Sequence, residues 1–529
     1  MKSYFSPSYL AALLPAALIA YAVVPKRFRW AVLLLFSYGF VWAISQKLIV
    51  FLLVTTLVTY LLGLGMGKLL AARDAQLAET KKGKREIKAA CKRKMKLLLV
   101  VGILVDFGIL VALKYLGFFG EVASSALGLF GIDATFRAPR IGITIGISFY
   151  TLMAVSYLLD VYRETEKADR NLGRVALFLS FFPQIMEGPI CRYGQTAMAL
   201  TAGNNLTRAN LHYGLLRIAV GLAKKLVVAD RLDLFVKPVF ENYAQYDGGV
   251  IALGAVLYTL QLYCDFSGCM DVAIGSARLF GVEFPENFRQ PFFSKTASEF
   301  WQRWHITLGT WFKDYIYYPI SLSKPVKSLT SKARKRFGNR YGPLLTSSIA
   351  LFCVWLGNGL WHGAGSQYVA FGMYYFVLIM AGGFMEPAVQ AFAERHGINR
   401  ESAPYQAFRI ARTCIVIFAG ELVFRSTSFA DSLAMFGQIF SQFTLATIGS
   451  DALFAIGMDG DDFALVALCT ALIIAADVAR ERGHGFIDFV IDKGPVALWT
   501  TIFALAMSVV VFGAYGFGYA PVDPLYAHF

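Results

Sequence analysis

The sequence predicts an all-α protein, a polytopic bundle of transmembrane helices around a central cavity. Its composition excludes an ordinary soluble domain, because 57% of the 529 residues are hydrophobic and only 16% are charged. The mean hydropathy is +0.54. Apolar runs of roughly 20 residues also recur along the chain, and each is long enough to cross the hydrocarbon core of a bilayer, about 30 Å.

We expect about eleven spanning helices plus re-entrant or broken helices, all in one membrane domain covering residues 1–529. A further helix is expected from Leu211 to Arg231. The expected spans are roughly residues 9–24, 30–44, 48–70, 97–119, 141–160, 250–264, 343–361, 366–385, 408–424, 463–478 and 496–514.

The net charge of +15 comes largely from short segments between the apolar runs. Residues 71–96 and 321–340 are expected to be cytoplasmic basic loops, because Lys and Arg accumulate on the cytoplasmic side of membrane proteins. The N-terminus is then extracytoplasmic. Residues 321–340 contain no acidic residue, so two roles stay open: orientation alone, or docking of an acidic carrier protein, anionic lipid or coenzyme phosphates. No basic globular domain is present to bind nucleic acid.

The run from Val175 to Arg192 breaks the helical pattern with two prolines and a glycine. It also holds Gln184 and Glu187, and polar groups of this kind do not face lipid. Irregular backbone at membrane depth is tolerated only against protein or a water-filled cavity. We therefore expect a re-entrant or broken segment that lines the central cavity.

Two of the six histidines, His305 and His362, each follow a tryptophan within a polar and aromatic cluster. A histidine in a polar cavity can act as a general base on a hydroxyl, and Asp314 or Asp265 could orient one ring. A purely structural role is the alternative. Asp265 and Asp271 could instead pair with Arg303. The seven cysteines show no metal-ligand spacing, so no metal site is expected. The residues expected to support the histidines or line the cavity are Trp304, Arg303, Asp314, Trp361, Asn358, Asp265, Glu187 and Gln184.

Several motifs in chain order resemble those of the membrane-bound O-acyltransferase family. The similarity is greatest to its bacterial branch, whose members act on alginate or on teichoic acids. These motifs place a catalytic core in residues 146–363. They are Gly146–Tyr150, Asp160–Arg163, Phe182–Gln184, Gly188–Ile190, Gly221–Lys225, Asp265–Gly268 with Asp271, Pro285–Phe288, Phe300–His305 and Trp361–Gly363.

The resemblance implies that His362 is the catalytic histidine and that His305 is the second family histidine. It implies a multi-pass protein of the bacterial inner membrane that takes an acyl group, here acetyl, from a cytoplasmic thioester. The donor is acetyl-CoA or an acyl carrier protein, and no cofactor is bound permanently. The acceptor is an extracytoplasmic polysaccharide, reached through a secreted transferase partner. An aromatic tail often ends such chains, which makes Tyr526 the candidate acyl relay, although its neighbours here differ.

Three alternatives remain. D-alanyl transfer to teichoic acid uses the same family chemistry on another polymer. A transporter or flippase would use Glu187, Arg192, Asp265 and Arg303 along a permeation path, but the sequence lacks the inverted repeat typical of that class. A scaffold for a secreted transferase is the third.

Overall fold

The computed structural model describes residues 3–80, 82–132, 142–516, 519 and 522. The described residues are helical, and the pairing of Phe288 with Trp304 is an isolated antiparallel bridge rather than a sheet. The chain divides into two units. The first comprises the described parts of residues 1–215 and 272–285, and the second comprises the described parts of residues 216–271 and 286–525.

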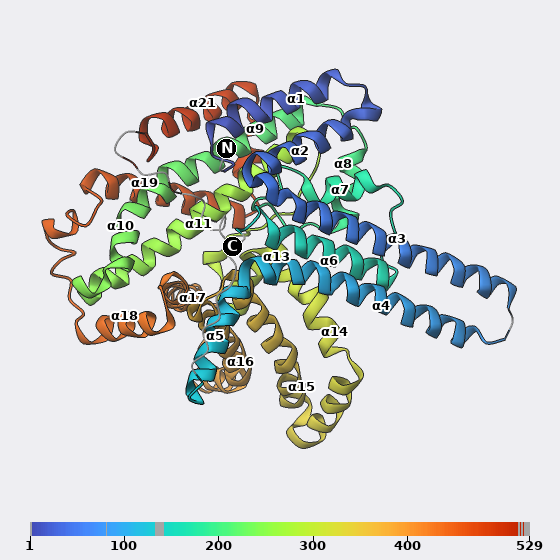
Figure 1. Cartoon of the computed structure of the whole chain (residues 1–529). Helices are drawn as coiled ribbons and strands as arrows, with labels where there is room; N and C mark the ends of the chain where they lie inside the picture. Colours follow the sequence, from blue (N-terminus) through green and yellow to red (C-terminus); the bar gives the residue numbers. More distant parts are fainter. Residues whose placement is uncertain (1–2, 81, 133–141, 517–518, 520–521, 523–529) are drawn as a thin grey trace. The chain divides into compact units, whose positions relative to one another are not determined.

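The first unit is built on the long antiparallel helices α3 and α4, against which α6 packs (Figure 1). Helix α3 is continuous well beyond its apolar part, and α4 begins in a basic stretch before becoming apolar. Its helices are α1 (Leu14–Val23), α2 (Arg29–Ser45), α3 (Ile49–Glu79), α4 (Lys84–Leu110), α5 (Leu116–Leu129), α6 (Ile147–Arg163), α7 (Leu172–Ser180), α8 (Tyr193–Thr201) and the beginning of α9 (Arg208–Ala223).

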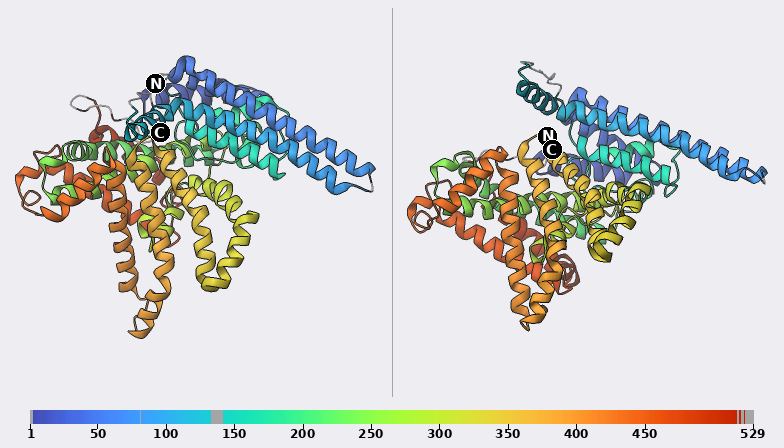
Figure 2. Two further views of the ribbon diagram at one scale, coloured as in Figure 1. Left: turned by 60° about the horizontal axis from the view of Figure 1, so that its bottom comes forward. Right: turned by 90° about the horizontal axis from the view of Figure 1, so that it is seen from below.

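The second unit contains the rest of α9 and the long helices α11, α15, α16 and α17. Helices α15 and α16 lie side by side, and α17 packs on α16 (Figures 1 and 2). Its other elements are α10 (Asp230–Glu241), α11 (Gly248–Leu279, mostly in this unit), α12 (Ala297–Arg303), α13 (Ile306–Phe312), α14 (Tyr318–Ser321), α15 (Lys324–His362), α16 (Ser366–Arg395), α17 (Ala403–Arg425), α18 (Phe429–Ser441), α19 (Gly460–Glu481), α20 (Phe486–Asp492) and α21 (Pro495–Phe512).

Seven helical segments among the described residues are long and apolar enough to cross a membrane. They contain eight of the expected spans, because residues 30–44 and 48–70 fall in one segment, Lys26–Glu79. The expected span at 9–24 corresponds to the shorter apolar helix Ser8–Val23. The chain is therefore all-helical with several membrane spans, and the total of eleven stays a prediction, as does the central cavity.

The two expected basic loops are wrong as loops, since both are largely helical. Residues 71–79 continue α3 and residues 84–96 begin α4, while residues 324–337 form the first part of α15. Lys, Arg, Ala and Glu are strong helix formers, so a helix continues through them after it leaves the apolar region.

The broken segment is confirmed as non-helical backbone between α7 and α8, and residues 181–191 are buried. Side chains satisfy its backbone: Ser37 Oγ accepts from Phe182 N at 3.1 Å, and Tyr4 Oη accepts from Met186 N at 3.0 Å. Gln184 Nε2 donates to Pro189 O at 2.9 Å, across the turn. Protein therefore surrounds this irregular backbone, as its depth in an apolar chain requires.

Gly146 gives a stability prediction for this segment. It has a φ of +68°, and a Cβ built there would lie 1.8 Å from the carbonyl oxygen of Ile185. We expect Gly146→Ala to cost about 1–2 kcal/mol from the left-handed backbone alone, and more from the collision. The control is Gly39→Ala in α2, where the added methyl meets nothing within 4 Å. Thermal unfolding of the purified proteins in detergent measures the difference, and equal midpoints would contradict this account.

Candidate functional site

His305 lies in a tight turn between α12 and α13. Its backbone is left-handed, with φ 45° and ψ 51°, which is uncommon for a residue other than glycine. The connector that follows α11 holds this turn, because Ile306 N donates to Asn287 O at 3.0 Å and Arg289 N donates to Arg303 O at 2.9 Å. The imidazole position is therefore set by two segments rather than by a single helix.

The side chain of Asn287 fixes the hydrogen-bonding state of His305. Asn287 Oδ1 accepts from Thr307 N and from Thr307 Oγ1, both at 2.9 Å, and lies 3.3 Å from His305 Nδ1. A backbone N–H can only donate, so the atom facing it must be the amide oxygen. Asn287 Nδ2 donates to Met270 Sδ at 3.1 Å, in agreement with this orientation. His305 therefore carries its proton on Nδ1, which leaves the lone pair on Nε2.

Burial keeps His305 neutral. The side chain is 2% exposed, and burial lowers the pKa of His305 from 6.5 to about 3. Phe266 meets the imidazole edge-to-face with ring centroids 4.7 Å apart. An imidazole that stays unprotonated at neutral pH can accept a proton, which is the first requirement for a general base.

His362 is the last residue of α15 and is also buried. Its ring contacts Phe371 and Phe424 edge-to-face, with centroids 5.9 and 5.1 Å away. The centroid of the Trp361 ring lies 4.9 Å from the centroid of the His362 ring and 5.6 Å from that of the His305 ring. Both imidazoles therefore touch one indole, and two histidines 57 positions apart in the sequence meet in one cluster of the second unit.

A network of buried ion pairs holds the elements around His305. Arg217 in α9 donates from both terminal guanidinium nitrogens to Glu286, at 2.7 and 2.6 Å, and from Nε to Asp271 at 2.6 Å. Lys224 also binds Asp271, at 2.8 Å. Burial would raise the pKa of the Glu286 carboxyl, but the charge of Arg217 overcomes this and lowers it. Because Glu286 precedes Asn287, the network fixes the connector that holds His305.

Lys224 and Lys225 begin the π-helical turn η5 (Lys224–Ala229), and Lys225 points to a second pair of carboxylates. Its Nζ lies 2.6 Å from Asp265 and 2.7 Å from Asp230, and all three side chains are almost completely buried. The interpretation that Asp265 and Asp271 pair with Arg303 is therefore wrong. Arg303 instead forms ion pairs with Glu299, at 2.9 Å, and with Glu481.

The other predicted site residues lie in the second unit, in the first unit or outside the described residues. Trp304 is buried and stacks on Phe300, and Asn358 is buried one helical turn before His362 in α15. Asp314 lies in a second π-helical turn, η8 (Lys313–Tyr317), and is half-buried. Gln184 and Glu187 belong to the broken segment of the first unit. Tyr526 lies outside the described residues.

Sequence reasoning missed three residues. Asn287 stands in the Pro285–Phe288 motif, for which no role was predicted, and Arg217 belongs to the expected helix from Leu211 to Arg231, for which no site role was predicted either. Glu421 is 2% exposed and lies one turn before Phe424, which contacts His362. A single carboxylate inside the apolar run 408–424 was a visible signal for Glu421.

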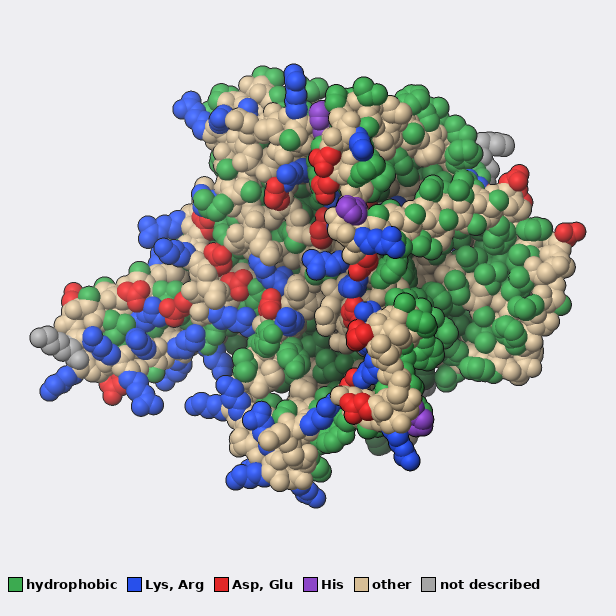
Figure 3. All heavy atoms as spheres, turned by 180° about the vertical axis from the view of Figure 1, so that it is seen from behind, with side chains coloured by type: hydrophobic (Ala, Val, Ile, Leu, Met, Phe, Trp, Pro, Cys, Tyr) green, Lys and Arg blue, Asp and Glu red, His purple; other side chains and the backbone are tan. Residues whose placement is uncertain are grey.

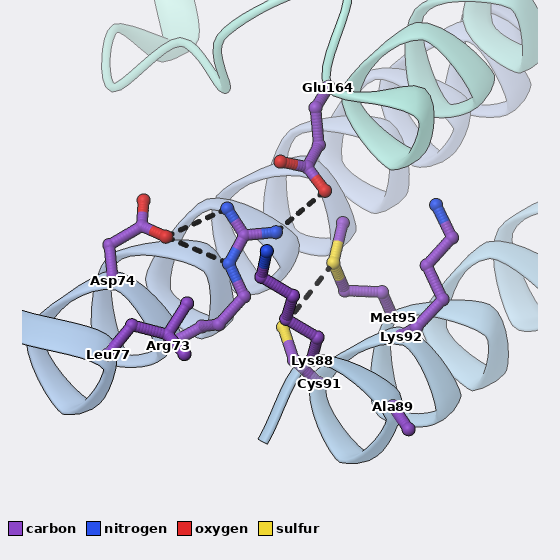
Figure 4. A pocket seen from close by; sticks show the side chains of 9 residues that line it. All are labelled: Arg73, Asp74, Leu77, Lys88, Ala89, Cys91, Lys92, Met95 and Glu164. Atoms are coloured by element: carbon purple, nitrogen blue, oxygen red, sulfur yellow. Dashed lines mark hydrogen bonds and ion pairs between the residues drawn. The ribbon is translucent and has the colours of Figure 1, made fainter. Parts of the chain in front are cut away.

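A pocket of about 500 Å³ lies in the first unit between α3, α4 and the residue after α6 (Figure 4). Arg73 binds Asp74 at 2.8 Å and Glu164 at 2.7 Å across it, and hydrogen bonding to Arg73 lowers the pKa of Glu164. Lys92 Nζ donates to Tyr162 O at 3.1 Å. The lining does not include either histidine, and four of its charged side chains already bind protein groups.

Comparison with known proteins agrees with this geometry. Residues 163–334 match the model of the MBOAT, membrane-bound O-acyltransferase family. A probable alginate O-acetylase AlgI from Pseudomonas syringae pv. tomato is 33% identical, over 83% of this chain and 75% of the relative. A peptidoglycan O-acetyltransferase from Helicobacter pylori is 30% identical, over 53% of this chain and 54% of the relative. A teichoic acid D-alanyltransferase from Bacillus subtilis is 32% identical, over 46% of this chain and 59% of the relative.

The AlgI relatives share most of their length with this chain, and the family model covers the Phe300–His305 motif. Together with the helical membrane architecture, this identifies the chain as a multi-pass membrane enzyme that transfers acyl groups. The chain belongs to the membrane-bound O-acyltransferase family.

Proposed function

We propose that this enzyme moves an acetyl group from a cytoplasmic thioester across the membrane, for O-acetylation of an extracytoplasmic polysaccharide through a secreted transferase partner. The donor is acetyl-CoA or an acyl carrier protein. The observation that carries the proposal is the cluster of His305, Trp361 and His362, in which both imidazoles contact one indole. The alginate-related proteins, similar over most of the chain, support acetyl as the acyl group.

In the proposed step, His362 accepts the proton of the acceptor hydroxyl while the hydroxyl oxygen attacks the thioester carbonyl carbon. The carbon–sulfur bond then breaks, and the departing thiolate takes the proton from the imidazolium. His305 donates no proton from Nδ1, which Asn287 engages, and its Nε2 can accept a hydrogen bond from the acceptor but cannot donate one to the thioester carbonyl. Asn287 is a positioning residue in this scheme, because it touches His305 rather than the substrate.

D-Alanyl transfer to teichoic acid is the second candidate. It is favoured by the similarity to the Bacillus subtilis D-alanyltransferase, which covers 46% of this chain. The two candidates share the histidine cluster and differ in donor and acceptor. Supplying acetyl-CoA, an acetylated carrier protein or a D-alanylated carrier protein to reconstituted enzyme separates them by the acyl group recovered on the acceptor.

The prediction for the catalytic base concerns His362. We expect His362→Ala to abolish O-acylation, with a loss of at least about 10²–10⁴-fold, because the general base is gone. Mass spectrometry of the exported polymer measures the ester content. His396→Ala is the matched control, since His396 is exposed and bonds only to the backbone of its own helix. Normal ester content in a folded His362→Ala protein would remove the assignment.

The second prediction separates positioning from chemistry at Asn287. Asn287→Asp keeps an oxygen facing Thr307 and His305 but places a negative charge beside the imidazole, so the pKa of His305 rises from about 3. A raised pKa means that His305 is protonated at higher pH, so the acid limb of the kcat–pH profile should move to higher pH. Asn287→Leu should lower kcat about 10- to 100-fold with little change in KM. Identical pH profiles for wild type and Asn287→Asp would contradict the positioning role.

The third prediction tests Tyr526 as the acyl relay. We expect Tyr526→Phe to stop transfer to the secreted partner, because phenylalanine lacks the oxygen that would carry the acyl group, while thioester turnover to water or a small alcohol continues. Trapped intermediate is measured by mass spectrometry of the purified enzyme after incubation with labelled donor. Label at another residue, or full polymer acetylation by Tyr526→Phe, would exclude a relay at this position.

A further inference from the structure

Residues 322–340, called the basic arm here, contain a helix at residues 324–337 that folds back on the candidate membrane span that follows it. Gly338 breaks α15 with φ 76°, and the helix resumes as residues 339–362. The two parts pack closely: Thr330 Oγ1 lies 2.9 Å from Thr346 Oγ1, and a Cβ on Gly342 would lie 2.6 Å from the backbone N of Arg334. The arm is therefore an ordered element that is tied directly to a candidate membrane span.

The arm is amphipathic. Its apolar residues recur at spacings of four, three, four and four, which places them on one face of a helix. Val326 is buried against the rest of the hairpin, whereas Leu322, Leu329 and Phe337 are 58%, 45% and 48% exposed. Exposed large apolar side chains on a helix that meets a membrane span are typical of a helix that lies in the membrane interface.

The remaining surface of the arm is positive. It carries seven cations and no acidic residue, and all seven are exposed: Lys324, Lys327, Lys332, Arg334, Lys335, Arg336 and Arg340. Arginines elsewhere, such as Arg73 and Arg303, form salt bridges, but no salt bridge within the described residues uses a cation of the arm. In Figure 3, seen from behind, blue Lys and Arg side chains gather on the lower lobe, where Figure 1 places α15.

We propose that the basic arm lies on the membrane surface and binds the headgroups of anionic phospholipids, with Leu322, Leu329 and Phe337 inserted at the acyl boundary. Charge complementarity favours this occupant, because each Lys or Arg near an anionic surface adds to the attraction. Membrane orientation alone requires cations beside a span, but it requires neither a folded helix nor an exposed apolar face. The arm has both.

The test measures hydrogen–deuterium exchange of the full chain in lipid nanodiscs of pure phosphatidylcholine and of phosphatidylcholine with 30% phosphatidylglycerol. We expect the amides of residues 324–337 to exchange at least about threefold more slowly in the anionic nanodiscs, because lipid contact suppresses opening of the helix. Raising the salt concentration to about 0.5 M should remove most of this difference, because it screens exposed charges. The salt experiment needs no substitution, so it does not depend on how a variant folds or inserts.

A variant in which four cations of the arm are replaced removes much of its charge. Its amides should exchange at the same rate in the two lipid compositions. The substitutions are Lys332→Gln, Arg334→Gln, Lys335→Gln and Arg336→Gln. A matched control changes Lys84, Arg85, Lys88 and Arg93 to Gln at the start of α4 and should leave the arm's protection unchanged. Equal exchange in neutral and anionic nanodiscs would overturn the proposal. Protection that appears only after an acidic carrier protein or coenzyme A is added would overturn it in favour of a docking site for a soluble donor.

Discussion

Buried charge is the constraint on which the second unit depends. Arg217, Lys224 and Lys225 face four carboxylates on α10, α11 and the connector, at distances of 2.6–2.8 Å. Glu286 and Lys224 are partly exposed, but Lys225, Asp230 and Asp265 are almost completely buried. An isolated charge in an apolar interior costs several kcal/mol, so each of these three groups is tolerable only beside its partner. Removing one member would leave an uncompensated charge, a loss of about 3–5 kcal/mol for a buried pair. The pairs therefore allow only one register between α9 and α11.

The connector after α11 links these ion pairs to the turn that carries His305. Glu286 is bound in bidentate fashion by Arg217, so the backbone at Asn287 has little freedom to move. Asn287 then bonds to the turn that carries His305, through both its side chain and its carbonyl. The left-handed backbone of His305 is a strained conformation for a side chain of this size, and it persists because two segments hold it. The ion pair between Arg217 and Glu286 thus helps to set the position of the His305 imidazole, which is itself neutral.

Much of the fold could be predicted from the sequence because hydropathy reports burial in lipid directly. Most apolar runs became long helices, and the prolines near Gln184 did mark broken backbone. The two basic segments were misjudged because charge says where a segment lies but not whether its backbone is helical. For the site, two Trp-His motifs identified the imidazoles, and the structure places both beside Trp361. The partners of Asp265 and Arg303 could not be predicted, since they depend on how helices distant in sequence face one another.

Trp361 has a larger part in this site than its place beside His362 suggests. Its indole contacts both imidazoles, and it is the last-but-one residue of a helix that ends at the site. A proton taken up by either imidazole would create a charge in buried and largely aromatic surroundings, which disfavour it. Asn287 contacts Nδ1 of His305, and the indole contacts both imidazoles. Trp361 therefore joins the turn between α12 and α13 to the end of α15, and its ring holds the two histidines in one cluster.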